Sequence, residues 1–141
     1  VARLFGFDPK VAFLSHSTFG KPISKNTKHV RDAIEILKNE KVDFDFDGEM
    51  QPDVALNPIY QEIYPFSKIV GNANILIMPA LHSAAISTKL MKVFGGGKLI
   101  GPLLIGLGLP IEVAPLRAST SEILNLASIA SYSSDIIDYS N

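Results

Sequence analysis

Short apolar runs alternate along the chain with longer segments in which apolar residues recur every three to four positions. The runs KVAFLS (Lys10–Ser15) and NILIMPA (Asn74–Ala80) are typical of strands buried in a parallel sheet. The segment VDFDFDGE (Val42–Glu49) alternates apolar and acidic residues, which predicts a strand with one face in water.

Three segments with helical spacing lie between and after these strands. Thr27 can cap the first of them, because a threonine hydroxyl accepts from the backbone at a helix start. The second spans His82–Phe94 and is closed by Gly95. Ser119 or Thr120 can cap the third, an apolar helix.

Proline positions indicate further short elements. Pro52 and Pro58 bracket one short helix, and Pro58 suits the first turn of another that ends near Tyr64. The stretch KLIGPLLIG (Lys98–Gly106) has the composition of a strand, and Pro102 within it predicts a bend or a sheet edge. IEVAPL (Ile111–Leu116) is expected to form another short strand.

Strands that alternate with helices predict an α/β fold, with a mostly parallel sheet and helices on both faces. Ligands of such sheets bind beyond the carboxyl ends of the strands. That rule points to three loops: Ser15–Gly20, Pro79–Ser83 and Leu116–Ser121.

Composition narrows the possible functions. The 141 residues carry a net charge of −1, so no broad electrostatic field attracts nucleic acid or an anionic membrane. The chain has no cysteine, which excludes disulfides and thiolate chemistry. No uninterrupted apolar run is long enough for a bilayer-spanning helix. The start shows no signal pattern and no initiator Met, so a piece of a longer cytoplasmic protein is expected.

The stretch VFGGGKLIGPLLIGLGLP (Val93–Pro110) contains six glycines and raises the question of a phosphate-binding loop. A Walker loop needs Ser or Thr after Gly-Lys, but Leu99 follows Lys98. The dinucleotide fingerprint fails as well, because Ile100 and Ile111 occupy the positions of its last glycine. A helix C-cap followed by a bent strand is the favoured interpretation.

The acidic cluster around Asp43, Asp45 and Asp47 has two interpretations, a metal site or a solvated strand face. Period-two spacing favours the solvated face. Glu49 and Gln51, at the end of the same strand, are better placed to line a cleft.

Several polar residues near the strand ends are candidates for ligand binding. His16 and His82 each follow a strand. Ser83 lies near a helix start, where it either binds an anion or caps the helix. Arg117 is either an anion clamp or a solvated arginine.

Four phrases together resemble the phosphotransacetylase family: LSHSTFG, DFDGEMQPDVALNP, YPFSKIVGNANILIMPALHSAAISTKL and GGGKLIGPLLIGLGLPI. They are most similar to the phosphotransacetylase-like C-terminal region of bacterial NADP-dependent malic enzymes. The resemblance spans Lys10–Ala130. It implies an isocitrate dehydrogenase-like fold of two α/β subdomains with a cleft between them. Residues 1–110 would form the second subdomain, and residues 111–141 would return to the first, whose remainder would lie upstream.

The resemblance also bears on catalysis. Active members of the family move an acetyl group between phosphate and coenzyme A, using a Ser-Arg pair followed by an acidic residue. In APLRASTSEIL, Arg117 matches the arginine but Leu116 replaces the serine, and Glu122 matches the acidic position only with a one-residue gap. Because leucine cannot hydrogen-bond the reacting groups, the transferase activity is expected to be lost.

The function implied is that of a non-catalytic regulatory and oligomerisation domain of an NADP-dependent malic enzyme. Such an enzyme oxidatively decarboxylates malate to pyruvate with NADP and Mg or Mn bound outside this chain, which itself holds no metal or cofactor. Acetyl-CoA would act as effector in the cleft of a homo-oligomer. The residues expected to bind its phosphoryl or acyl oxygens, or to shape the pocket, are Ser17, Thr18, Gly20, His82, Ser83 and Arg117.

Two alternatives remain from the sequence. One is a fragment of an active phosphate acetyltransferase, for which Leu116 is the discriminating residue. The other is a purely structural interface module, because LIGPLLIGLGLPI and the last helix offer apolar surface for a subunit contact.

Overall fold

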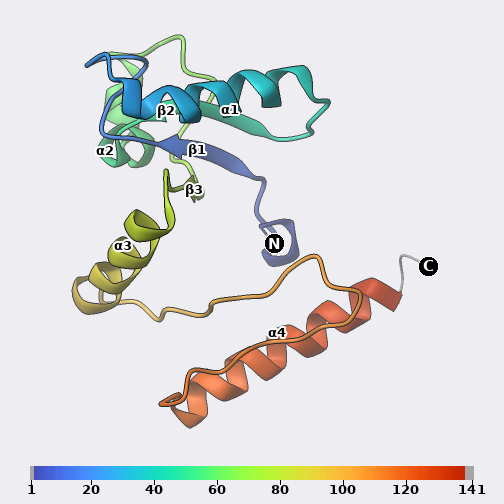
Figure 1. The fold of residues 1–141 in the computed structure, drawn as a ribbon. Coiled ribbons are helices and arrows are strands. Elements are labelled where there is room, and N and C mark those ends of the chain that lie inside the picture. Colours follow the sequence, from blue (N-terminus) through green and yellow to red (C-terminus); the bar gives the residue numbers. More distant parts are fainter. Residues whose placement is uncertain (1, 139–141) are drawn as a thin grey trace. The chain divides into compact units, whose positions relative to one another are not determined.

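Three parallel strands form the sheet of this computed structural model, which describes residues 2–138. They are β1 (Lys10–Leu14), β2 (Asp45–Met50) and β3 (Ile75–Ile77), in the order β2-β1-β3 (Figure 1). β1 is therefore the central strand and pairs in parallel with both neighbours. All three strands predicted in the first part of the chain are present, although β2 begins three residues later than expected.

The predicted helices are present, and two short 3-10 helices, η1 and η2, were not predicted. Their bounds are η1 (Arg3–Phe5), η2 (Lys25–Thr27), α1 (Lys28–Asn39), α2 (Pro52–Leu56), η3 (Pro58–Gln61), α3 (Leu81–Phe94) and α4 (Thr120–Asp138). The prolines at positions 52 and 58 bracket α2, and Pro58 begins η3 as expected, but η3 ends at Gln61 and not near Tyr64. Among residues 2–138, no helix is both long and apolar enough to cross a membrane.

Successive side chains of β1 point to opposite faces of the sheet, and each face packs against a helix. One buried cluster joins the sheet to α1 and consists of Val11, Val30, Ile34 and Phe46. The other includes α2 and consists of Ala12, Leu14, Met50, Ala55, Ile69 and Ala73. The structure thus confirms the predicted α/β class with helices on both faces of a parallel sheet.

The chain divides into two compact units, Val1–Lys89 and Leu90–Asn141. The first contains the sheet. The second contains the end of α3, a segment without helix or strand at residues 95–119, and α4. The predicted division at residue 110 concerns the longer two-subdomain fold and stays a prediction.

The prediction of strands at residues 98–106 and 111–116 is wrong. No strand is present between α3 and α4. Gly101 and Gly106 have φ angles of 129° and 80°, outside the range of an extended strand, and Pro102 has no N–H to donate. The other half of the interpretation is confirmed: the Gly95 N–H donates to the Met91 carbonyl at 2.8 Å, closing α3.

The predicted wet face of β2 is only partly correct. Asp43 and Asp45 are exposed, but Asp47 is buried. Its two carboxylate oxygens accept from the backbone N–H groups of Gly48, at 2.9 Å, and Lys68, at 2.7 Å. Hydrogen bonds from the protein replace the water that the alternation predicted around this carboxylate.

Two isoleucines of α1 differ in burial, and this difference gives a testable prediction. Ile34 is 3% exposed and Ile36 is 65% exposed. Ile34→Ala should lower the free energy of unfolding by about 2–5 kcal/mol, since it removes transfer energy and leaves a cavity. Ile36→Ala, the control in the same helix, should change it by less than about 1 kcal/mol. Urea denaturation measures both, and equal losses would contradict the packing of α1 against the sheet.

Candidate functional site

The carboxyl ends of the three parallel strands meet at one edge of the sheet, where ligands of such folds bind. Ser15 follows β1 and Gln51 follows β2. The backbone N–H of Ser15 donates to the Met50 carbonyl at 2.9 Å. The Gln51 side-chain amide donates to the His16 carbonyl at 2.6 Å. The segments that leave β1 and β2 are therefore fastened to each other.

The loop Ser15–Gly20, called here the β1 loop, folds back on itself. Thr18 and Lys21 exchange two backbone hydrogen bonds of 2.9 and 3.0 Å. Phe19 has a φ of 48° and Gly20 a φ of 82°, so both lie in the left-handed region that favours glycine. The Phe19 ring packs against Phe66 with a centroid distance of 4.8 Å. The loop thus has a defined shape.

A bulge in β2 places Glu49 beneath this loop. Phe13 pairs with Gly48 and Leu14 pairs with Met50, so Glu49 is left out of the ladder. A bulge of this kind redirects a side chain. A Cβ on Gly48 would lie 2.6 Å from the Phe13 carbonyl oxygen, which makes glycine necessary where the strands approach.

The Glu49 carboxylate is buried, with its side chain 0% exposed, and Arg31 of α1 pairs with it. The Arg31 Nη1–Glu49 Oε1 distance is 3.0 Å. The same oxygen accepts from the Ser17 hydroxyl at 2.7 Å and from the Gly20 N–H at 3.1 Å. Arg31 also donates to the Ser24 carbonyl and the Thr27 hydroxyl. The ion pair and these hydrogen bonds offset the cost of burying the Glu49 charge.

A groove of about 230 Å³ runs beside this network. Its charged lining consists of two cations and two anions, and the Lys38–Glu35 pair at 2.6 Å matches the Arg31–Glu49 pair. Because each cation already has a carboxylate partner, the groove offers no excess positive charge to an anion.

The predicted ligand residues of the β1 loop lie together, but their polar groups bind protein atoms. Ser17 is fully buried and donates to Glu49. The Thr18 hydroxyl accepts from the Gln51 N–H at 3.1 Å. Gly20 donates its N–H to Glu49. His16, in contrast, is exposed at the strand end.

His82 and Ser83 lie side by side at the start of α3. His82 is exposed. The Ser83 hydroxyl donates to the Ala80 carbonyl at 2.7 Å and lies 3.3 Å from the Ala80 N–H. Ser83 is thus the third residue of α3 and bonds back to the residue that precedes the helix, instead of being its N-cap residue. Its role in anion binding stays a prediction.

Arg117 and its neighbour Leu116 are exposed residues of the second unit, whereas the other five predicted ligand residues belong to the first. Within residues 2–138, no ion pair holds Arg117. The turn that presents it is closed by a 2.9 Å bond from the Ala118 N–H to the Pro115 carbonyl.

Ser119 and Glu122 form a capping box at the start of α4. Glu122 Oε2 accepts from the Ser119 N–H at 2.8 Å and from its hydroxyl at 2.9 Å. Lys92 approaches the other oxygen at 3.4 Å. These contacts, the Ser119 N–H first, lower the pKa of Glu122 below its ordinary value.

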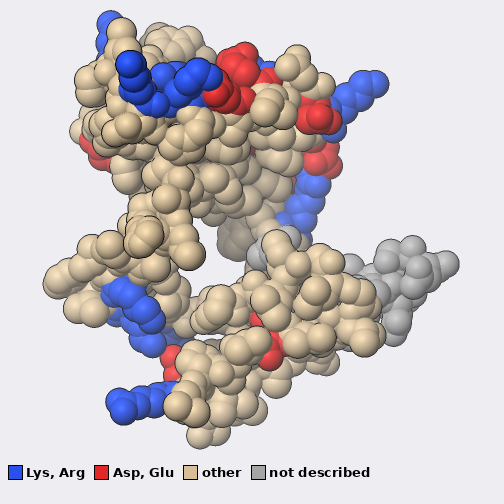
Figure 2. Space-filling view, in the orientation of Figure 1, with Lys and Arg blue, Asp and Glu red and all other residues tan. Residues whose placement is uncertain are grey.

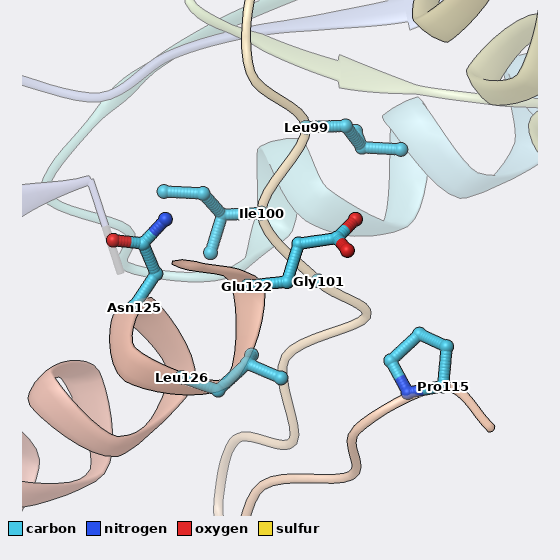
Figure 3. A pocket seen from close by; sticks show the side chains of 7 residues that line it. All are labelled: Leu99, Ile100, Gly101, Pro115, Glu122, Asn125 and Leu126. Carbon is cyan, nitrogen blue, oxygen red and sulfur yellow. The ribbon is translucent and has the colours of Figure 1, made fainter. Parts of the chain in front are cut away.

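Two hollows in the second unit meet at Glu122. The smaller, of about 10 Å³, has room for about one water. Figure 3 shows its lining, with Leu99 and Ile100 from the segment after α3 and Asn125 and Leu126 from α4. The larger, of about 460 Å³, is lined by Lys92, Gly97, Lys98, Leu99, Ser119, Ser121, Glu122 and Asn125.

Sequence reasoning missed the role of Arg31 and the placement of Lys98 in this larger hollow. The Thr27–Arg31 spacing of four residues is compatible with their hydrogen bond, but no local pattern marks the pairing of Arg31 with Glu49. No local pattern marks the placement of Lys98 either. Among the described residues, no group of three His, Asp or Glu is placed to hold a metal ion.

Comparison with known proteins identifies the class. The family model of the phosphate acetyl/butaryl transferases matches residues 1–131. The chain therefore belongs to this family. It is 48% identical, over 94% of its length, to the NADP-dependent malic enzyme of Rhizobium meliloti, and 35% identical, over 91%, to the phosphate acetyltransferase of Bacillus subtilis.

Solved structures support the same fold. A phosphotransacetylase from Streptococcus pyogenes superposes over 94% of this chain and 41% of its own, with 36% identity and a TM-score of 0.86. The EutD phosphotransacetylase from Staphylococcus aureus gives a TM-score of 0.84 at 33% identity, over 94% of this chain and 42% of its own. The chain spans 17% of the Rhizobium malic enzyme and 40% of the Bacillus transferase.

The capping box predicts how Glu122 titrates. Ser119→Ala should raise the pKa of Glu122 towards its ordinary value, because one of its stabilising donors is removed. Ser128→Ala, in the same helix, removes a hydroxyl that bonds only the Leu124 carbonyl and should leave this pKa unchanged. Carboxyl chemical shifts followed by NMR against pH measure both variants.

The same shift sets the pH at which the cap fails. The folded-state pKa lies below the ordinary value, so the carboxylate stabilises the folded state at neutral pH. That contribution is lost as the pH falls through the folded-state pKa. An unshifted Glu122 in the wild type would contradict the capping box.

Proposed function

We propose that this chain is a non-catalytic regulatory domain of an NADP-dependent malic enzyme and that it senses acetyl-CoA. The observation that carries the proposal is Leu116, which stands beside Arg117 where the transferase motif has serine. An aliphatic side chain cannot donate to a reacting phosphoryl or acyl oxygen. Arg117 keeps the charge needed to bind such an oxygen.

The state of Glu122 supports the absence of transfer chemistry. A general base for a thiol works best with a pKa near the operating pH. The pKa of Glu122 is shifted the other way, and its oxygens already accept from Ser119 and Lys92. A carboxylate used as a helix cap is a poor acceptor for the coenzyme A proton.

The larger hollow of the second unit supports binding of a phosphorylated ligand. Lys98 and Ser121 line it near the start of α4, and a cation beside a helix start favours anionic groups. Lys92 and Ser119 also line it but already bind the Glu122 carboxylate. Arg117 lies two residues before Ser119. Of the residues expected to bind acetyl-CoA, the direct contacts we propose remain His82, Ser83 and Arg117, whereas the polar groups of Ser17, Thr18 and Gly20 bind protein atoms.

In this proposal the oxidoreductase chemistry belongs to other parts of the protein, which bind NADP and Mg or Mn. Acetyl-CoA acts as effector by binding differently to two arrangements of a homo-oligomer, which is a coupling free energy between distinct sites. The 48% identity to a malic enzyme is the main support for this context.

Each of the two other candidate functions has a specific observation in its favour. An active phosphate acetyltransferase is favoured by the 35% identity to the Bacillus subtilis enzyme. A structural interface module is favoured by exposed apolar side chains of the second unit, namely Leu104, Ile105, Leu107, Leu109 and Ile111. The face of this unit that Figure 2 shows carries few charged side chains. Formation of acetyl phosphate would establish the first, and assembly without acetyl-CoA binding the second.

Isothermal titration of the intact protein with acetyl-CoA tests the proposal. We expect saturable binding and a change in malate turnover. Arg117→Ala should weaken binding by about tenfold or more, the loss expected for a hydrogen bond to a charged group. Arg3→Ala is the control, because Arg3 pairs with Asp43 on the surface. No binding at millimolar acetyl-CoA would reject the sensor role.

A further inference from the structure

One buried oxygen atom fastens the β1 loop to the rest of the first unit. Glu49 Oε1 accepts from Ser17 Oγ at 2.7 Å, from the Gly20 N–H at 3.1 Å and from Arg31 Nη1 at 3.0 Å. The donors come from the loop and from α1, and the acceptor comes from β2. Three elements therefore converge on a carboxylate that water does not reach.

Ser17 is in no position to touch a ligand in this arrangement. The residue is 0% exposed, and its hydroxyl proton points at Glu49. Its oxygen lies 3.3 Å from the Ser15 hydroxyl, which also approaches the Ser17 N–H. All the polar contacts of this side chain are thus with protein atoms.

The loop needs such a fastening because its backbone is strained. Phe19 adopts a φ of 48°, a left-handed conformation that is uncommon for residues other than glycine. Strain of this kind persists only when the surrounding bonds over-determine the backbone. Here the Phe19 N–H donates to the Glu49 carbonyl at 2.7 Å, and the Glu49 carboxylate holds the residues on both sides.

We propose that Glu49 and Ser17 are positioning residues that set the shape of the β1 loop and so determine how the exposed His16 is presented at the carboxyl edge. Ser17 acts through Glu49 rather than on the ligand. The consequence for acetyl-CoA affinity rests on the proposed function, whereas the consequence for the loop does not.

Hydrogen exchange at the Gly20 amide in the 141-residue chain tests the fastening without any ligand. Ser17→Ala leaves the Glu49–Arg31 pair in place and should speed this exchange about tenfold or more, the size expected for a lost hydrogen bond to a charged group. Glu49→Gln should speed it further. Glu35→Gln is the matched control, since Glu35 lies in α1, as Arg31 does, and pairs with Lys38 at the surface. Unchanged exchange in Ser17→Ala overturns the proposal.

A double-mutant cycle on acetyl-CoA affinity in the intact protein tests the route of action. If Ser17 acts through Glu49, Ser17→Ala weakens binding in the wild type and has no further effect in a Glu49→Gln background. Equal losses in both backgrounds would mean that Ser17 touches the ligand, and would overturn the proposal. Glu35→Gln again serves as the control.

The exchange measurement and the affinity measurement distinguish the positioning role from the proposed function. Absence of acetyl-CoA binding in the wild type rejects the proposed function, and the exchange measurement then decides the positioning role alone. If Glu49→Gln fails to fold, Ser17→Ala still decides it. Faster Gly20 exchange in Ser17→Ala supports the proposal, and wild-type exchange rejects it.

Discussion

The first unit depends on the burial of one negative charge. Removing a carboxylate from water costs on the order of several kcal/mol unless a partner compensates it. Glu49 is compensated by Arg31 and by two donors of the β1 loop. The pair requires α1 to lie against β2, and the donors require the loop to fold over the bulge. Helix, strand and loop are therefore coupled through a single side chain, and the carboxyl edge inherits its shape from them.

The elements that sequence patterns predicted well are those whose signals are local. The apolar run of β1, the helical spacing of α1 and the glycine that closes α3 each specify structure within a few residues. The burial of Glu49 and Asp47 has no such signal. Acidic residues that alternate with apolar ones look the same whether they face water or, like Glu49, an arginine eighteen positions earlier. Only the tertiary structure distinguishes the two cases.

Two strands were predicted between α3 and α4, where the structure has none. The residues around Pro102 have the apolar composition of a strand, but composition measures how well side chains fit a sheet and not whether a sheet is present. Gly101 and Gly106 turn the backbone out of the extended region. The same segment keeps its apolar side chains at the surface of the second unit, which is the observation behind the interface alternative.

The start of α4 connects a folding signal with the chemistry of the family. Ser119 and Glu122 have the spacing of a capping box, and the structure uses them as one. A carboxylate that satisfies the N–H of its own helix start gains stability when charged, so its pKa falls. A thiol needs a base with the opposite tuning. In the function that we propose, Glu122 therefore holds the start of α4 instead of accepting a proton, and Leu116 offers no hydroxyl to a reacting group.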